Sequence, residues 1–449
     1  MEEELSVKEA LNKGVEKHNK GEIKEAEYIY RQILKVDENN SDAWHLLGLI
    51  AFQVEKYEDS VRDIKRAIEI NSNQAVYYGN LGMVYDKMGD EEESTKNFEI
   101  ALKIDPEYEK SKFAYYNLGV YYLNKGEVEK ALENYDKAIE LDSEFYDARW
   151  NRALIYLLTG KFKEGWKEYE NRFKKEKPSD VRDFGKPKWD GSVLDGKRIL
   201  VLCEQGFGDS IQFIRYVSLV KEKGGYVVLE CKKELKKLFE KLNYIDEIVE
   251  KGDGVPVVDY DYYIYLMSLP GIVDFESVSK ESYLKADSEL VKKYKDKIKS
   301  DKFKIGIAWQ GNSNQENDKN RSTKFENFKS LNIPDVQLYS LQKGKGVEQI
   351  DDSVVDLSDD INDFSDTAAI ISNLDLVISV DSSVAHLAGA LGKPVWTVLT
   401  FMPDWRYMLE KDDCVFYESM KLFRQKKQGD WKDVFEKVRE GVVKLVNDK

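Results

Sequence analysis

The sequence has too little of several features to belong to three common classes of protein. Its three cysteines, at positions 203, 231 and 414, are too few and too scattered for a disulfide framework or a zinc site. No apolar run approaches the ~18 residues that a membrane-spanning helix needs. The first residues lack the basic and apolar regions of a signal peptide. We therefore expect a cytoplasmic protein without a membrane span.

An excess of basic charge is missing as well. The 449 residues include 69 Lys and Arg against 84 Asp and Glu, a net charge of −15. This balance argues against a nucleic-acid binder. The two signs are mixed along the chain, as on solvated helix faces. With 42% hydrophobic residues, and at roughly 100–200 residues per domain, the chain should hold two to four domains, each with its own core.

A glycine recurs with a period near 34 in the first 175 residues. Gly14, Gly48 and Gly82 are 34 residues apart, and Gly119 follows after 37. An aromatic residue four positions before the glycine and a leucine directly before it recur in register. The pattern resembles the tetratricopeptide repeat, and we predict about five repeats over residues 5–175. The resemblance implies a right-handed superhelix whose concave groove binds a peptide or partner protein. A spacer or dimerisation arm with an empty groove is the alternative.

The fifth unit, from about residue 146 to 173, lacks the recurring set and is rich in large aromatics, including Trp150, Trp166 and Tyr169. We interpret it as a cap that docks the repeats on the C-terminal part of the chain. Residues 176–197 contain two Pro and three Gly without a clear period, which predicts a linker.

From residue 198 onward, apolar β-branched runs alternate with helical patterns, which predicts parallel sheets. The first half, residues 198–300, should contain strands at 198–204, 226–231, 246–250 and 261–266, with helices at 210–223 and 233–242. The second half, residues 301–449, should contain strands at 303–309, 335–341, 354–357, 373–380 and 395–399. Its helices are predicted near 364–372, 381–391 and 431–446, after a charged helix at 289–300.

A glycine-rich turn, Gln205 to Asp209, follows the first of these strands. It is not the dinucleotide fingerprint, because Ile211 occupies the third glycine position, and no Walker lysine follows. Asp209 would repel phosphate at the helix start, so the turn suits a positioned base better than a phosphate cradle. The alternative is that Asp209 only caps the helix while Gly206 and Gly208 allow the turn.

The segment from residue 378 to 396 reads as a buried strand, a turn, a short helix and a second strand. His386 lies opposite the apolar stripe of that helix, between Gly389 and Ala390, where small side chains leave room for an approaching group. In a doubly wound α/β fold the loop after a strand is where ligands bind. The alternative is that His386 is a surface histidine and Asp381 a helix cap.

The loop from residue 310 to 324 is long, polar and basic at its end. Gln310, Asn312, Lys319 and Arg321 could bind an anion there, and the planar fork of arginine suits a diphosphate. A surface loop without a ligand has the same composition.

Taken in order along the chain, several motifs resemble those of the heptosyltransferase-like glycosyltransferases of family 9. They are CEQGFGDSIQFIRY, IGIAWQGN with NRS, YSLQKG, ISVDSSVAHLAGALGKPVW and DWR. More closely, they resemble bacterial proteins that join tetratricopeptide repeats to such a domain. The resemblance covers residues 190–430 and implies a GT-B fold of two Rossmann-like domains, with acceptor on the first half and sugar-nucleotide donor on the second. It also implies that the last helix packs back on the first half.

The resemblance also assigns roles to single residues. Asp209 falls on the general base of the family, and Arg321, or less directly Lys319, on the basic residue at the donor diphosphate. The Asp-x-x-x-x-His segment of the family falls on Asp381 and His386. Ser383 stands where heptosyltransferases usually have glycine, so the donor sugar stays open. The full set expected at the donor is Gln310, Asn312, Lys319, Arg321, Asp381, Ser382, Ser383 and His386.

The predicted function is a metal-independent, inverting transfer of a sugar from a nucleotide sugar to a hydroxyl, on a protein or peptide that the repeats hold. No cofactor is expected besides the nucleotide sugar as substrate. Asp259 and Asp261 have the Asp-x-Asp form of a metal-dependent class, but we interpret them as loop residues beside a strand. The alternatives are an enzyme acting on lipopolysaccharide or another glycan, and a non-catalytic repeat scaffold.

Overall fold

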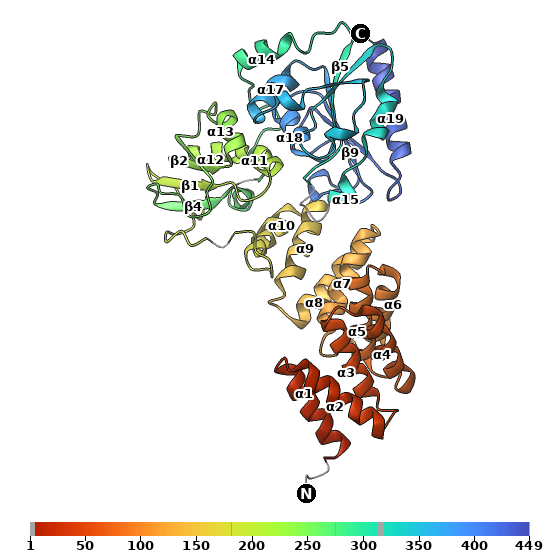
Figure 1. Ribbon diagram of the computed structural model, residues 1–449. Helices are drawn as coiled ribbons and strands as arrows, with labels where there is room; N and C mark the ends of the chain where they lie inside the picture. Colours follow the sequence, from red (N-terminus) through yellow and green to blue (C-terminus); the bar gives the residue numbers. More distant parts are fainter. Residues whose placement is uncertain (1–4, 181, 274, 313–317, 449) are drawn as a thin grey trace. The chain divides into compact units, whose positions relative to one another are not determined.

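The structure is a computed structural model that describes residues 5–448 apart from 181, 274 and 313–317, and without the side chains at 277, 319 and 320. The chain divides into two compact units, Met1–Arg152 and Ala153–Lys449, and the division falls within helix α9 (Figure 1). Within the described ranges, no helix combines the length and the apolar character that crossing a membrane would take.

The first unit consists of helix pairs, each joined by a short loop (Figure 1). The two helices of a pair approach closely at the recurring glycine. A Cβ atom added to Gly48 would lie 2.5 Å from Ile64, and one added to Gly119 would lie 2.5 Å from Tyr135. The absence of a side chain thus allows the packing that the period predicted. The pairs are α1 (Val7–Asn19) with α2 (Ile23–Val36), α3 (Ser41–Gln53) with α4 (Tyr57–Ile70), α5 (Ala75–Met88) with α6 (Glu91–Ile104), and α7 (Ser111–Asn124) with α8 (Val128–Leu141).

The end of α9 (Tyr146–Leu158), α10 (Phe162–Tyr169) and the 3-10 helix η1 (Glu170–Phe173) open the second unit. Trp166 and Tyr169 are buried and lie against Trp405 of the α/β region, with ring centroids 5.3 and 6.3 Å apart. This part of the predicted fifth repeat therefore packs on the α/β region, as expected of a cap.

The first α/β half has a parallel four-stranded sheet in the order β3-β2-β1-β4. Its register is fixed by pairs such as Leu200 with Val228 and Leu200 with Tyr263. The elements are β1 (Arg198–Leu202), α11 (Phe207–Phe213), η2 (Ile214–Tyr216), α12 (Val217–Glu222), β2 (Tyr226–Cys231), α13 (Lys233–Phe239), β3 (Glu247–Glu250), β4 (Tyr262–Tyr265), η3 (Leu266–Gly271) and η4 (Phe275–Ser277).

The second half has a parallel six-stranded sheet in the order β10-β9-β8-β5-β6-β7. The central strands β5, β8 and β9 are almost wholly buried, as their β-branched composition predicts. The elements are α14 (Ser288–Lys295), β5 (Phe303–Ala308), α15 (Asp318–Arg321), α16 (Phe325–Phe328), η5 (Lys329–Leu331), β6 (Val336–Ser340), η6 (Val347–Gln349), β7 (Val354–Asp356), η7 (Ser358–Asp360), α17 (Phe364–Ser372), β8 (Leu376–Val380), α18 (Ser383–Ala390), β9 (Val395–Leu399), η8 (Trp405–Tyr407), β10 (Met420–Arg424) and α19 (Trp431–Asn447).

The architecture confirms the predicted fold class: helical repeats followed by two α/β halves with parallel sheets, consistent with the GT-B arrangement. Three expectations need correction. The helix after the glycine turn begins at Phe207 and is interrupted by η2, and the edge strand β10 was not predicted. The last helix does not pack on the first half. Its buried residues Phe435 and Val438 join the core of the six-stranded sheet, beside Phe328 and Trp396.

Candidate active site

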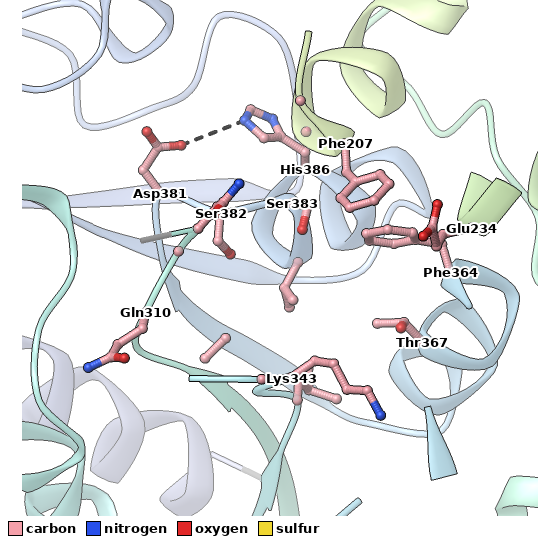
Figure 2. A pocket seen from close by; sticks show the side chains of 18 of the residues that line it. Phe207, Glu234, Gln310, Lys343, Phe364, Thr367, Asp381, Ser382, Ser383 and His386 are labelled. Atoms are coloured by element: carbon pink, nitrogen blue, oxygen red, sulfur yellow. Dashed lines mark ion pairs between the residues drawn. The ribbon is translucent and has the colours of Figure 1, made fainter. Parts of the chain in front are cut away.

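A cavity of about 740 Å³ lies between the two α/β halves of the second unit (Figure 2). The glycine turn after β1 forms one wall. The opposite wall is formed by the segments that follow β5, β6 and β8 of the second half. All of these segments leave the carboxyl ends of parallel strands, where ligands bind in open α/β sheets.

The cavity brings together ten of the eleven residues predicted for the site. They come from four separate segments of the chain, and they are Gly206, Gly208, Asp209, Gln310, Asn312, Arg321, Asp381, Ser382, Ser383 and His386. The eleventh, Lys319, has its side chain outside the described residues, although the backbone of α15 includes it.

Asp209 both caps its helix and faces the second half. Its Oδ2 accepts a hydrogen bond from the backbone N–H of Gly206 at 2.9 Å, which closes the first turn of α11. Its Oδ1 forms an ion pair with Nη2 of Arg406. The side chain is 18% exposed. The cap thus uses one oxygen and the ion pair with Arg406 the other, while Asp209 also lines the cavity, so capping does not by itself exclude a role in the site.

Asp381 follows β8 but does not cap α18, since the residue at the cap position is Ser382. The Asp381 carboxylate is instead directed to side chains. Its Oδ1 accepts a hydrogen bond from the Tyr407 hydroxyl at 2.7 Å and lies 3.7 Å from Nε2 of His386 (Figure 2). Burial of Asp381 raises its pKa, but His386, Arg321 and Tyr407 outweigh burial and lower the pKa to about 2. Asp381 is therefore an anion at neutral pH.

His386 is not a surface histidine, because it is 4% exposed. Its Nδ1 lies 3.2 Å from the Tyr417 hydroxyl while Nε2 faces Asp381. The space left by the small neighbours is filled from within the protein. A Cβ atom on Gly389 would lie 2.6 Å from the Tyr417 ring, and one on Gly208 would lie 2.8 Å from the His386 ring. The histidine is thus held where the two halves approach closely.

Arg321 supplies positive charge to the cavity wall formed by the second half. It ends α15, its side chain is 18% exposed, and its Nε donates to Asp318 at 3.3 Å. Gly311 leaves room for it, since a Cβ atom there would lie 2.5 Å from Nη2 of Arg321. Nearby, Gln342 holds the Gln310 backbone by accepting from its N–H at 3.0 Å and donating to its carbonyl at 3.2 Å.

Two phenylalanines from different halves meet at another side of the cavity. Phe207 of the glycine turn and Phe364 of α17 have ring centroids 4.9 Å apart, and both rings line the cavity (Figure 2). Nζ of Lys232 lies 4.7 Å above the Phe207 ring. Lys343, at the end of β6, also lines the cavity and donates to the Ser358 carbonyl at 2.8 Å.

Asp404, Arg406 and Tyr407 received no role from the sequence, although the DWR motif is part of the resemblance. All three lie at η8, and Asp404 and Arg406 line the cavity. The contact between Arg406 and Asp209 joins residues 197 positions apart, so no local pattern could have predicted it. Among the described residues, no cluster of three or more His, Cys, Asp or Glu side chains is placed to hold a metal ion.

Known families match segments in both the repeat region and the α/β region. Residues 41–74, 75–108 and 113–145 match the tetratricopeptide repeat. Residues 361–408 match glycosyltransferase family 9 (heptosyltransferase). The second match spans β8, α18 and η8, which carry Asp381, His386 and Arg406.

Individual proteins match as well. Protein FlbA of Caulobacter vibrioides is 27% identical over 425 residues, which cover 86% of this chain and 70% of FlbA. The TPR repeat-containing protein MJ1428 of Methanocaldococcus jannaschii is 28% identical over 108 residues, covering 24% of this chain and 18% of that protein. A crystal structure of MamA is 26% identical, with a TM-score of 0.32 over 35% of this chain and 91% of MamA. The chain thus has segments that match the tetratricopeptide repeat, followed by a segment that matches glycosyltransferase family 9, and both matches agree with the resemblance of the sequence motifs.

Proposed function

We propose that the protein transfers a sugar from a nucleotide sugar to an acceptor hydroxyl, without a metal ion and with inversion at the anomeric carbon. One observation carries the proposal. Asp209 of the first half and the Asp381–His386 pair of the family 9 segment line the same cavity from opposite walls. A base on one wall and a donor-binding segment on the other are what a single displacement between two bound substrates requires.

The donor diphosphate would bind at the start of α18 and at Arg321. The hydroxyl of Ser382, the residue at the cap position, forms a hydrogen bond with the hydroxyl of Ser379, with 2.8 Å between the two oxygens. The Ser382 side chain makes no cap hydrogen bond to the first turn of α18, and Ser382, Ser383 and Val384 at this helix start line the cavity. A helix N-terminus and an arginine fork both favour a diphosphate. They would stabilise the negative charge that gathers on the leaving group.

In the proposed reaction the acceptor oxygen attacks the anomeric carbon and gives its proton to the Asp209 carboxylate. A new C–O bond forms while the bond between the anomeric carbon and the phosphate oxygen breaks. The electron pair of that bond leaves with the nucleoside diphosphate. Attack opposite to the leaving group inverts the anomeric configuration. General-base assistance of this kind is worth roughly 10²–10⁴-fold in rate.

The acceptor is proposed to be a protein or peptide that the repeats hold, in the cytoplasm. Three matched tetratricopeptide segments support this choice, because stacked repeats expose an extended surface suited to polypeptides. A glycan acceptor would need no such surface, so the repeats favour a polypeptide.

The test is a thermal-shift screen of the full-length chain with UDP, ADP, GDP and dTDP, followed by mass spectrometry with the corresponding nucleotide sugars. We expect at least one nucleotide to raise the melting temperature, and the matching sugar to be hydrolysed or transferred. Asp209→Ala should abolish transfer and leave nucleotide binding nearly intact. Asp259→Ala is the matched control, because Asp259 is an exposed aspartate of the same half outside the cavity.

Each alternative function predicts a different result. A repeat scaffold without catalysis predicts no stabilisation by any nucleotide and no turnover. Full transfer by the Asp209→Ala chain would refute the base. Transfer to a glycan in the absence of any polypeptide acceptor would refute the proposed acceptor and favour the lipopolysaccharide-type enzyme.

A further inference from the structure

The short 3-10 helix η8 contacts the proposed base, the donor-side carboxylate and the last repeat-like helix. Arg406 pairs with Asp209, and the neighbouring Tyr407 donates to Asp381 at 2.7 Å. Trp405 packs on Trp166 of α10 with ring centroids 5.3 Å apart. Three consecutive side chains therefore reach three separate parts of the second unit.

The Arg406 guanidinium has a fixed acceptor for each of its three nitrogens. Nε donates to Oε1 of Gln212 at 2.8 Å, Nη1 donates to Oδ1 of Asp404 at 2.7 Å, and Nη2 pairs with Asp209. Arg406 is 7% exposed. A planar, buried fork with all three nitrogens engaged has one orientation, so it presents Nη2 to Asp209 from a defined direction.

Asp209 is consequently fixed from two sides. Its own helix turn engages Oδ2 through the Gly206 N–H at 2.9 Å, and the second half engages Oδ1 through Arg406. Each carboxylate oxygen has a second lone pair, so both bonds leave the group able to accept a proton. The arrangement fixes the base relative to the half that would hold the donor.

We infer that Arg406 is a positioning residue for Asp209, setting the direction from which the base meets the acceptor hydroxyl. The inference rests on the proposed function for its catalytic meaning, whereas the pairing itself can be tested without turnover. Arg406 acts through Asp209 in this account and does not contact the reacting atoms.

Several charged and titratable groups surround this pair. Asp404 lies on η8 beside Arg406, and the Asp381 carboxylate acts on Asp404 from the end of β8. Tyr169 of α10 faces both Arg406 and Asp209. Glu204, at the end of β1, is paired with the buried Arg172 at 3.0 Å and so already has a cation of its own. Burial raises the pKa of Asp404, Arg406 lowers it, and Asp381 raises it again.

Arg406 is therefore the cation shared by Asp209 and Asp404. Replacing Arg406 with a neutral residue would leave these two carboxylates close together without a positive charge between them. Asp404, whose pKa Arg406 lowers, should then bind a proton at higher pH than in the unchanged chain.

The first experiment compares kcat and KM for the full-length chain, Arg406→Lys and Arg406→Gln. The donor is whichever UDP, ADP, GDP or dTDP sugar is turned over. We expect Arg406→Gln to lower kcat by about 100-fold, the scale of a misplaced reacting group, with the donor KM unchanged. Arg406→Lys should restore part of kcat, because it returns a cation to Asp209. An unchanged kcat in Arg406→Gln, or a loss of kcat that Arg406→Lys does not relieve, would overturn the inference.

The second experiment needs no turnover and measures thermal unfolding at pH 8 and pH 5.5. We expect Arg406→Gln to lose more stability at pH 8 than at pH 5.5, because Asp404, left without its cation, is charged at the higher pH and binds a proton more readily as the pH falls. The loss should shrink when Asp209→Asn is present in the same chain.

Arg215→Gln is the matched control for this experiment. Arg215 is equally buried, but it donates to neutral acceptors: the carbonyls of Gln212 and Phe416 and the Tyr283 hydroxyl, at 2.9, 2.7 and 3.0 Å. The stability lost in Arg215→Gln should therefore be the same at both pH values. If Arg406→Gln behaves like Arg215→Gln and does not couple to Asp209→Asn, the pairing is refuted. If the pairing holds but no sugar is turned over by any chain, the proposed function fails instead.

Discussion

The contact between Gly208 and His386 gives the sharpest test of the candidate site. The two residues belong to different α/β halves, and no side chain separates them. Replacing Gly208 with alanine would place the new Cβ atom 2.8 Å from Cδ2 of His386 and 3.6 Å from Cα of Ser383. The backbone of Gly208 is not in the left-handed region, so alanine should cost little there except through this contact.

The size of the effect follows from how firmly His386 is held. Carbon atoms in good contact lie about 3.5–4.0 Å apart, so the ring or the turn must move by about 1 Å. The ring cannot withdraw freely, because Tyr417 lies 3.2 Å from Nδ1 and Asp381 lies 3.7 Å from Nε2. Overpacking of this kind costs about 1–3 kcal/mol. Since 1 kcal/mol shifts the melting temperature of a domain of 150–250 residues by about 2–4 °C, we expect a decrease of roughly 3–10 °C.

The assay is thermal unfolding of Gly208→Ala, with Gly252→Ala as the matched control. Gly252 belongs to the same half, has no left-handed φ, and a Cβ atom there would meet nothing within 4 Å. The control should melt within about 1 °C of the unchanged chain. Gly208→Ala should also bind the stabilising nucleotide more weakly, because the strain falls on α18 between Ser383 and His386. Equal melting temperatures for the two variants would refute the close approach of the halves at this point.

Two further predictions concern charge and domain boundaries. Asp381→Asn should lower the free energy of unfolding by about 2 kcal/mol between pH 6 and 8, and the difference should close as the pH falls from about 4 toward 2. The folded chain lowers the pKa of this carboxyl to about 2, so the charged group stabilises the fold above its unfolded pKa of about 3.9, and the stabilisation is lost as the carboxyl binds a proton. Urea unfolding at several pH values measures this difference in free energy. A difference that does not depend on pH would contradict the prediction. A shortened chain that begins at residue 143 should keep a cooperative thermal transition. A chain that begins at residue 176 should melt at least about 10 °C lower or aggregate, because it lacks the buried Trp166 and Tyr169. Equal melting temperatures of the two chains would show that α10 is dispensable.

Local patterns predicted most of the secondary structure. The strands at Tyr226–Cys231 and Val395–Leu399 and the helix Phe364–Ser372 have the predicted bounds. The reason is that a continuous β-branched run indicates a strand buried on both faces, whereas an apolar stripe indicates a helix buried on one face. The edge strand β10, of sequence MKLFR, was missed because its short run mixes exposed and buried positions and is no longer than many loop segments.

Packing partners were harder to predict than elements. The stripe of Val434, Phe435, Val438 and Val442 on α19 correctly indicates a buried face. An apolar stripe does not say which apolar surface covers it, and the structure places it on the six-stranded sheet of the second half. The same limit applied to His386, whose small neighbours indicated a close approach but not that Tyr417 and Gly208 make it.

The site shows the same division between local and distant information. Asp209, Asp381 and His386 could be proposed because each follows a strand at a recognisable turn, and the structure brings them to one cavity. Arg406 could not be given a role, because its partner lies on the other half and 197 residues away. A buried arginine in a 3-10 helix of three residues has no periodic signature, so only the folded arrangement identifies what it pairs with.

The position of η8 also bears on how repeats and chemistry could be connected. Trp405 packs on α10, which belongs to the predicted fifth repeat, and Arg406 beside it holds the proposed base. Tyr169 of α10 also meets the glycine turn, where Gln205 donates to its hydroxyl at 3.1 Å. The last repeat-like helix is therefore built into the body that carries the site. On the function proposed above, α10 would then contribute to the alignment of the base, because Trp166 packs on Trp405 beside Arg406.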